Sequence, residues 1–333
     1  MATYKGIQGY SVQKLSSDPT ASEAEGQLWY NSGSGKFKIS IAGAGAWSSG
    51  GALNSARQQI AGIGTKTAAL AVAGSPYPSV AAYTEKYDGT TWTEVNDLNT
   101  SQRNAKGTGS TTAGMVVGGY GAAVVTATET YDGTSWTETG HALSRTGGTQ
   151  SAGIAGASAT SVIYFGGDPG VPNAKLSETY NGTTWTEGSD LNSGRQAPGG
   201  VGIVTAALCI AGYNAPAAQI NNVESYDGSS WAETSTDINS ARGEAGACGT
   251  STACLFFGGS PGAQALTESF NGTTWTEVAD LATDRSTIGS AQAPTNLNTG
   301  ALGFGGYYPP GTNTDVTEEW SDPVYTIKTV TVS

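Results

Sequence analysis

The feature that most constrains this fold is a short stretch, residues 84–94, that recurs along the chain. It reads Thr-Glu-Lys-Tyr-Asp-Gly-Thr-Thr-Trp-Thr-Glu. Asp-Gly and Asn-Gly dipeptides tolerate the positive φ of a type I′ turn, and the flanking Thr, Tyr and Trp favour strands. Each copy is therefore predicted to be a β-hairpin with positive φ at both turn residues; the other copies contain Tyr131–Trp136, Tyr180–Trp185, Tyr226–Trp231 and Phe270–Trp275.

The hairpin has one face that must be buried. Side chains alternate along a strand, so paired strands place Tyr87 and Trp92 on the same face, and Glu85 joins them. An isolated hairpin is only marginally stable in water, so each copy needs neighbours to cover its aromatic rings. This pattern is typical of a repeat protein.

The repeat has a period in the forties, set by Trp47, Trp92, Trp136, Trp185, Trp231 and Trp275. An all-β period of this length is typical of four-stranded propeller blades. After each Trp come a Leu or Ile, an Arg, a strand of small residues that we expect near the axis, and a hydrophobic strand ending in Gly. Six such hydrophobic strands predict six blades, over residues 53–92, 103–136, 145–185, 195–231, 242–275 and 285–325.

The two ends of the chain lie outside this register. The strand around Trp47 has no inner strands before it, so we expect it to close the last blade, unless Trp320–Tyr325 forms its own hairpin. Closure would remove exposed sheet edges. Residues 1–46 contain a predicted hairpin and are interpreted as an adaptor that attaches the repeat body (47–325), or as a decoration packed on it. The tail, 326–333, alternates like a strand and could pair within the body or with another subunit.

Arginine is confined to one part of the repeat. Each Arg follows a repeat Trp by nine to eleven residues. Its planar guanidinium can hold a carboxylate or two carbonyls in a fixed plane, which Lys cannot do. We expect each Arg to pair with a repeat Glu in its own blade or the next, and an Arg ring binding an anion at one rim is the alternative. The residues are Arg57, Arg103, Arg145, Arg195, Arg242 and Arg285, with Glu85, Glu129, Glu178, Glu224, Glu268 and Glu318.

Composition argues against several classes of function. The net charge is −12 and only 13% of residues are charged, so a nucleic-acid surface of clustered Lys and Arg is not expected. No apolar run is long enough to cross a bilayer, so membrane insertion is not expected, and the start of the chain lacks the apolar core of a signal peptide. Cys209, Cys248 and Cys254 are expected to be buried thiols.

No catalytic, cofactor or metal site is expected. His141 is the only histidine, and the Cys and His residues lack zinc-site spacing. No Gly-x-Ser-x-Gly motif lies between a strand and a helix. Most Asp and Glu residues recur with the period, which indicates scaffold or turn roles. An enzyme acting on polysaccharide remains a distant alternative.

The glycine pair followed by Tyr and Trp resembles the kelch repeat over residues 47–325, and fits less well with the tryptophan-aspartate repeat. Ala73-Gly74 and Ala211-Gly212 replace the Gly-Gly pair in two copies, which makes the bends there less certain. The resemblance implies an all-β, six-bladed kelch-like β-propeller with a short N-terminal β-hairpin adaptor.

The near-identical copies, low charge and Gly, Ala, Ser and Thr richness resemble kelch-like virion proteins of marine bacteriophages, notably those infecting cyanobacteria. Residues 17–38 resemble a segment of phage tail and structural proteins, and residues 46–57 resemble the first repeat boundary of the kelch-like members. The resemblance implies a non-enzymatic virion protein present in multiple copies. We expect it to contact other virion proteins through residues 1–46 and, as a second contact, through the tail.

The loops that follow the Gly-Gly strands are expected to cluster on one face. Tyr beside Pro suits stacking on a sugar or docking of a protein. Two roles stay open: a tail-fibre or adhesin module that binds a host-surface glycan or protein, and a purely architectural component in which these loops are only connections. The candidate contact residues are Tyr77, Pro172, Asn214, Tyr307 and Tyr308.

Overall fold

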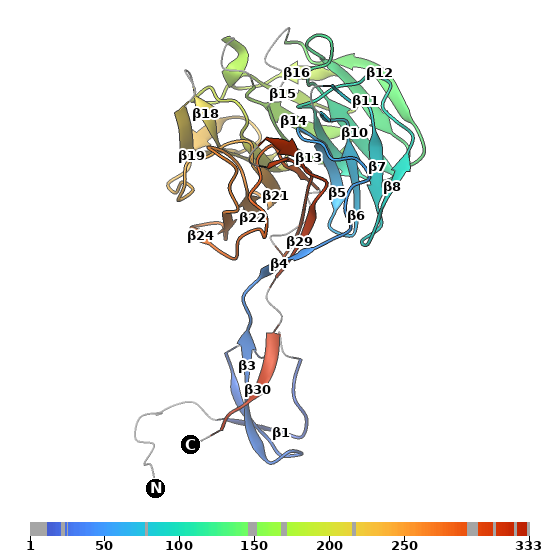
Figure 1. Ribbon diagram of the computed structural model, residues 1–333. Coiled ribbons are helices and arrows are strands. Elements are labelled where there is room, and N and C mark those ends of the chain that lie inside the picture. Colours follow the sequence, from blue (N-terminus) through green and yellow to red (C-terminus); the bar gives the residue numbers. More distant parts are fainter. Residues whose placement is uncertain are drawn as a thin grey trace. The chain divides into compact units, whose positions relative to one another are not determined.

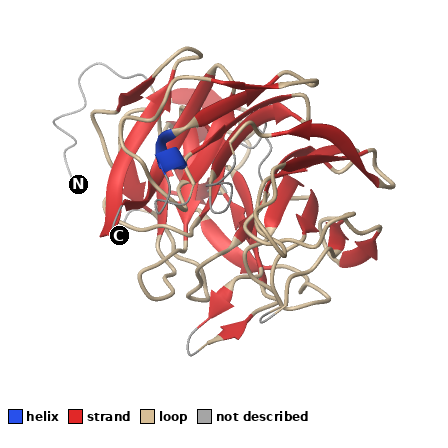
Figure 2. Ribbon diagram, turned by 90° about the horizontal axis from the view of Figure 1, so that it is seen from above, coloured by secondary structure: helices blue, strands red, loops and turns tan. Residues whose placement is uncertain are grey.

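The computed structural model describes residues 12–20, 24, 26–76, 79–145, 152–167, 172–214, 218–291, 299–308, 311–322 and 325–331. The described residues are all-β, with one 3₁₀ turn, η1 (Pro172–Lys175), and otherwise only strands and loops (Figures 1 and 2). The chain divides into two compact units. One contains both chain ends, residues 1–46 and 322–333, and the other is the repeat unit, residues 47–321.

The first unit is built on a four-stranded sheet, which we call the N-terminal sheet. Its strands, in order, are β1 (Gln13–Leu15), β2 (Leu28–Asn31), β3 (Lys36–Ala42) and β30 (Tyr325–Thr329). β1 and β2 are parallel, and the other pairs are antiparallel. The tail strand therefore pairs with β3, inside the unit that also contains residues 1–46. Residues 322–325, expected in the last blade, belong to this unit.

A small polar cluster holds the predicted β2–β3 hairpin to the loop before it. Asp18 accepts hydrogen bonds from the Trp29 indole (3.0 Å) and from the Asn31 amide (2.5 Å). Trp29 is almost completely buried. One indole and one carboxylate thus anchor the loop over one face of the sheet.

In its described residues, the repeat unit contains six four-stranded antiparallel sheets, numbered here from the N-terminus. From first to last strand they are sheet 1, β5 (Ala61–Thr65), β6 (Ala68–Val72), β7 (Thr84–Tyr87) and β8 (Trp92–Val95); sheet 2, β9 (Lys106–Ser110), β10 (Ala113–Val117), β11 (Ala127–Tyr131) and β12 (Trp136–Ala142); sheet 3, β13 (Gly153–Ser158), β14 (Ser161–Phe165), β15 (Ser177–Tyr180) and β16 (Trp185–Glu187); sheet 4, β17 (Gly199–Ile203), β18 (Ala206–Asn214), β19 (Ala218–Tyr226) and β20 (Trp231–Glu233); sheet 5, β21 (Gly246–Thr250), β22 (Ala253–Phe257), β23 (Thr267–Phe270) and β24 (Trp275–Glu277); and sheet 6, β25 (Gly289–Ser290), β26 (Gly300–Phe304), β29 (Thr317–Ser321) and β4 (Ala46–Ser49).

The first strands of these sheets lie against one another. β5 contacts β9, β9 contacts β13, and the series continues through β17 and β21 to β25, which contacts β5. Small residues fill these strands, as their expected place near an axis requires. The arrangement is consistent with a multi-blade β-propeller.

Sheet 6 is completed by the strand that contains Trp47. β4 pairs with β29, and the Gly50 amide donates to the Thr317 carbonyl (2.9 Å). The Trp47 and Trp320 rings are 5.6 Å apart, so Trp320 takes the Tyr position of its repeat. The structure thus supports the shared last sheet, not a separate Trp320–Tyr325 hairpin.

The repeat hairpin has the predicted faces but a different turn. Tyr87 pairs directly with Trp92, with ring centroids 4.8 Å apart. Gly89 adopts a φ of 95°, whereas Asp88 is not among the residues with positive φ, so this is not a type I′ turn at Asp-Gly. The Asp88 carboxylate instead accepts hydrogen bonds from the Thr90 and Thr91 amides, both 2.8 Å. Aspartate is used here as a side-chain acceptor.

The bends after the inner hydrophobic strands are kept in every sheet. Ala73 and Ala211 adopt φ values of 59° and 56°, close to the 58° to 70° of the glycines at the same position. Gly74 and Gly212 follow at 107° and 109°. The alanines therefore occupy the left-handed region at some cost in strain, and the bend does not depend on the first glycine.

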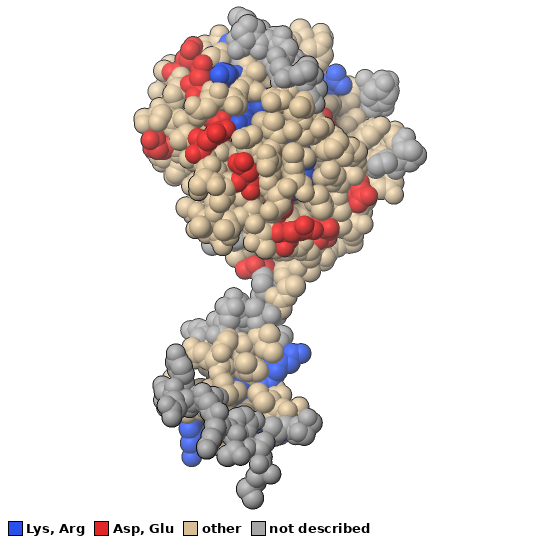
Figure 3. All heavy atoms as spheres, turned by 90° about the vertical axis from the view of Figure 1, so that its left-hand side faces the viewer, with Lys and Arg blue, Asp and Glu red and all other residues tan. Residues whose placement is uncertain are grey.

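The repeat unit is strongly acidic. It carries 10 Lys or Arg and 23 Asp or Glu, a net charge of −13. On the face shown in Figure 3 the acidic side chains are scattered, with few basic ones between them. Its exposed surface therefore disfavours polyanionic ligands.

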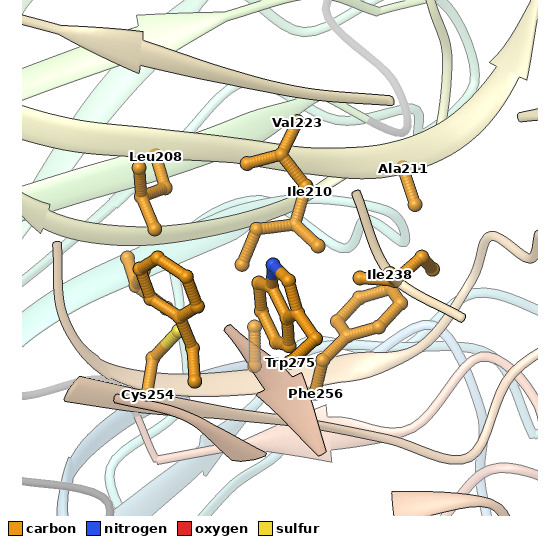
Figure 4. Packing of buried hydrophobic residues seen from close by; sticks show 11 residues of the cluster. Leu208, Ile210, Ala211, Val223, Ile238, Cys254, Phe256 and Trp275 are labelled. Atoms are coloured by element: carbon orange, nitrogen blue, oxygen red, sulfur yellow. The ribbon is translucent and has the colours of Figure 1, made fainter. Parts of the chain in front are cut away.

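Hydrophobic clusters fill the spaces between neighbouring sheets. The largest lies between sheets 4 and 5, where Trp275 stands among Ile210, Val223 and Phe256 (Figure 4). Cys254 lies in the same cluster, and Cys209 and Cys248 are also buried free thiols. Each repeat Trp is thus part of the packing between two sheets.

Four indoles also form a hydrogen bond to the preceding sheet. Each donates to the threonine hydroxyl that precedes the repeat Glu there, at 2.9 to 3.1 Å: Trp92 to Thr317, Trp136 to Thr84, Trp185 to Thr128, and Trp47 to Thr267. The indoles of Trp231 and Trp275 are buried without a partner. The residues at the acceptor position there are Ser177, whose hydroxyl donates to the Ser189 carbonyl, and Val223.

Replacing Val223 with threonine should stabilise the protein by about 1 kcal/mol, because the new hydroxyl would accept from the Trp275 indole and remove an unsatisfied buried donor. Chemical denaturation followed by tryptophan fluorescence would measure the effect. Val72→Thr is the matched control, since Val72 is equally buried and the same hydroxyl should destabilise there. Equal losses in both variants would contradict the assignment.

Candidate functional site

In five of the six sheets, the turn before the first strand contains a strained residue. Five such residues, none of them glycine, have positive φ: Gln59 (59°), Asn104 (56°), Ala197 (51°), Glu244 (56°) and Thr287 (52°). This conformation is uncommon outside glycine and is a true outlier for a β-branched threonine. Residues held in sparsely populated regions cluster at functional sites, which makes this position a candidate.

Hydrogen bonds between neighbouring turns hold these residues in place. The Gln59 amide donates to the Thr287 carbonyl (3.0 Å), and the Thr287 amide donates to the Glu244 carbonyl (2.8 Å). The Glu244 amide donates to the Ala197 carbonyl (3.1 Å), and the Asn104 amide donates to the Gln59 carbonyl (3.0 Å). The corresponding turn of sheet 3 lies in residues 146–151, outside the described residues. The strain is thus supported by bonds that run from sheet to sheet.

These turns surround a small hollow, which we call the axial mouth. It is lined by Gln59, Asn104, Lys106, Glu244, Thr287 and their apolar neighbours, and the centres of water molecules could occupy about 40 Å³ there. That is room for a few waters. Lys106 also lines a second hollow of about 20 Å³ next to the first strands of the sheets.

Two charged side chains face the axial mouth. Burial lowers the pKa of Lys106 to about 8, an effect that Glu244 opposes. Burial raises the pKa of Glu244, and Lys106 opposes that shift. No ion pair between them is present among the described residues, so each retains capacity for hydrogen bonding.

A wider groove opens beside the axial mouth and shares Gln59, Glu244 and Thr287 with it. It has a volume of about 450 Å³ and is also lined by Gln58, Ser260 and Tyr307. A second space of about 520 Å³ also touches Gln58 and Tyr307 and lies next to the hairpin of β27 (Tyr307–Tyr308) and β28 (Thr312–Asn313). We call these two spaces and the axial mouth the rim groove. Each of the two larger spaces has a volume in the range of small-molecule sites.

Only part of the expected rim set lies here. Tyr307 lines the rim groove, and Tyr308 beside it is 43% exposed. Asn214 ends β18 and does not line the groove; its Oδ1 atom is buried without a partner. Pro172 begins η1, but its side chain and the whole of Tyr77 lie outside the described residues.

In five of the six repeats, the arginine forms a buried ion pair with the repeat Glu. Ion pairs join Arg57 to Glu85, Arg145 to Glu178 (2.8 Å), Arg195 to Glu224 (2.6 Å), Arg242 to Glu268 (2.5 Å) and Arg285 to Glu318 (2.9 Å). All ten side chains are buried. Each pair lies within one sheet and the turn that leads into it. The five guanidinium groups therefore do not form an anion-binding ring at a rim.

Arg103 is the exception, because it stands one residue beyond the arginine position. Gln102 occupies that position. The Gln102 carbonyl accepts a hydrogen bond from the Gly74 amide, just as the Arg57 carbonyl accepts one from the Gly306 amide. Arg103 makes no ion pair with Glu129, and its guanidinium lies 5.6 Å from the Tyr120 ring centroid. Glu129 is satisfied instead by the Asn99 amide groups and the Thr100 amide. The expected Arg103–Glu129 pair was wrong.

His141 contacts a tyrosine of the neighbouring sheet and is not fully exposed. Its Nδ1 atom lies 2.6 Å from the Tyr180 hydroxyl, at hydrogen-bond distance. The side chain is half-buried at the edge of sheet 2, and it joins this sheet to sheet 3. It has no contact with the rim groove.

The residues of the axial mouth were missed by the sequence analysis, although a signal exists. Those with positive φ stand two residues after the arginine position, where the repeat reads Gln, Asn, Ala, Glu and Thr while the scaffold positions recur. A variable position within a regular repeat is a reasonable place to look for ligand contacts. None of these five strained residues is a glycine, so the sequence does not mark the positive φ at this position.

Comparison with known proteins adds no assignment: no protein-family model and no curated protein sequence matches the chain. Across the described ranges, no group of three or more His, Cys, Asp or Glu side chains is placed to hold a metal ion. Within those same ranges no helix has the length and apolar character to cross a membrane.

Proposed function

We propose that the chain is a phage virion structural protein whose repeat unit is a six-bladed, kelch-like propeller that contacts the host surface. Six sheets with the same strand order, and first strands that contact one another from β5 round to β25 and back, support six blades. The resemblance of the repeats and of residues 17–38 to phage proteins supports the virion role.

The observation that carries the binding role is the rim groove. It combines a rigid backbone, fixed by hydrogen bonds between sheets, with an exposed tyrosine ring and several polar side chains. Rigid scaffolds that present aromatic side chains in a hollow suit recognition of another molecule. The role proposed is binding, as in a tail-fibre or adhesin module, not catalysis.

The unit that contains both chain ends is proposed as the attachment to other virion proteins. Leu28, Phe37 and Ile41 project from the same face of the N-terminal sheet, and each is more than a third exposed. Large apolar side chains gathered on one face of a small sheet favour a protein interface.

Purified protein should compete with intact particles for adsorption to cyanobacterial host cells. Tyr307→Ala/Tyr308→Ala should weaken the competition at least about tenfold if the two rings contribute about 1.4 kcal/mol or more of binding. Tyr83→Ala is the control, because Tyr83 is similarly exposed but does not line the rim groove. Adsorption can be counted as free infectious particles after mixing.

Two results would contradict the proposal. Absence of the protein from purified particles, by mass spectrometry, would remove the virion role. Presence in particles without any competition for adsorption would leave a purely architectural component.

A further inference from the structure

The axial mouth and the groove beside Tyr307 form one continuous surface. Gln59, Glu244 and Thr287 line both. A ligand lying against Tyr307 would therefore present its edge to the polar groups at the mouth. The volume beside Tyr307, about 450 Å³, exceeds that of a single sugar ring.

The polar groups at the mouth have unused hydrogen-bonding capacity of both kinds. The Gln59 Oε1 atom is shielded from solvent without a donor. Lys106 offers up to three donors and Glu244 several acceptor sites, and neither is joined to the other. Buried polar atoms left unpaired are costly, so a ligand that supplies both donors and acceptors would gain binding energy here.

The charges of the mouth balance one another. Lys106 belongs to β9 of sheet 2, and Glu244 lies in the turn that leads into sheet 5, three sheets away in either direction. An anion near Lys106 would also meet Glu244 and the net −13 of the repeat unit. A cation near Glu244 would meet Lys106. The site thus favours a neutral ligand over either ion.

Hydroxyl groups are the neutral groups that both donate and accept. A pyranose ring carries several of them at its edge, and its face of C–H bonds stacks on aromatic rings, as the exposed Tyr307 ring permits. We propose that the rim groove binds a neutral sugar residue of a glycan, with its face on Tyr307 and its hydroxyls on Gln59 and Glu244, which line the same space. The inference rests on the proposed host-contact function and names its ligand class.

Ligand-observed NMR would test this with a panel of glucose, galactose, mannose and N-acetylglucosamine, and with galacturonate as the acidic comparator. At least one neutral sugar should bind with millimolar affinity, and galacturonate more weakly. Glu244→Gln and Tyr307→Ala should each weaken binding about tenfold. Glu94→Gln and Tyr83→Ala, on exposed residues outside the groove, should leave it unchanged. Melting curves of all four variants would show that they are folded.

Each negative result has a defined meaning. Binding of no neutral sugar, or tighter binding of galacturonate, would overturn the inference, and so would full binding by folded Tyr307→Ala. If the protein fails any of these sugar-binding tests but still competes with particles for host cells, the host-contact function stands and only the ligand class is wrong. If a sugar binds but competition is absent, the site is correct and the adsorption role fails.

Discussion

Replacing Arg195 with alanine is expected to lower the free energy of unfolding by about 3–5 kcal/mol. Arg195 and Glu224 are both fully buried and 2.6 Å apart. The guanidinium also donates to the carbonyls of Asn222 (2.8 Å) and Ala211 (3.3 Å). Alanine would leave a buried carboxylate held only by neutral donors, and it would remove a donor from the carbonyls of Ala211, Asn222 and Ser193. Denaturant titration of both proteins would measure the loss.

The chain supplies its own control. Arg103→Ala should cost less than about 1 kcal/mol, because Arg103 has no ion pair and only lies near the Tyr120 ring. Arg195→Ala/Glu224→Gln should recover part of the loss, since the uncompensated charge is removed. Equal losses in Arg195→Ala and Arg103→Ala would show that the ion pairs are not what stabilises the repeats.

The features set by the period could be predicted from the sequence. Strand alternation placed Tyr87 and Trp92 on one face, and the structure pairs them directly. The sequence left one strand, at Trp47, without partners and one copy, the last, without its outermost strand. The structure places both in sheet 6. In both cases a local pattern, repeated along the chain, leaves one geometric solution.

The Arg103 error came from measuring position from the tryptophan. Arginine stands four residues after Leu53, Leu191, Ile238 and Leu281 and two residues after Leu143, whereas Arg103 stands five residues after Leu98. An offset of one residue turns a side chain away from its partner in extended structure. Counting from the leucine would have placed Gln102 at this position.

Other features depend on contacts that the sequence does not mark. The tail alternates like any strand, so its pattern could not distinguish β3 from an edge in the repeat unit. The positive φ of Gln59 or Thr287 is imposed by hydrogen bonds from neighbouring sheets, not by a glycine. The axial mouth therefore could not be derived from local propensity, because tertiary structure overrides it.

Gly62→Ala is expected to destabilise the protein by about 3 kcal/mol or more, at the contact between the first and last sheets. A Cβ atom at Gly62 in β5 would lie 1.9 Å from the carbonyl oxygen of Ser290 in β25. That atom belongs to a backbone held in its own sheet, so relief requires the two first strands to separate. Gly200, whose Cβ would lie 2.3 Å from the Ile154 carbonyl oxygen, makes the same kind of approach between sheets 3 and 4.

Gly300→Ala separates this effect from the general cost of changing a strand glycine. Gly300 lies in β26, and a Cβ atom there would meet only the Lys66 side chain, at 3.8 Å. Its stability should stay within about 0.5 kcal/mol of the parent protein. Thermal unfolding of the two variants side by side gives the comparison, and amide hydrogen exchange in β5 and β25 should increase only in Gly62→Ala. If Gly62→Ala were as stable as Gly300→Ala, the first and last sheets could not be in the close contact that makes the repeat unit one body.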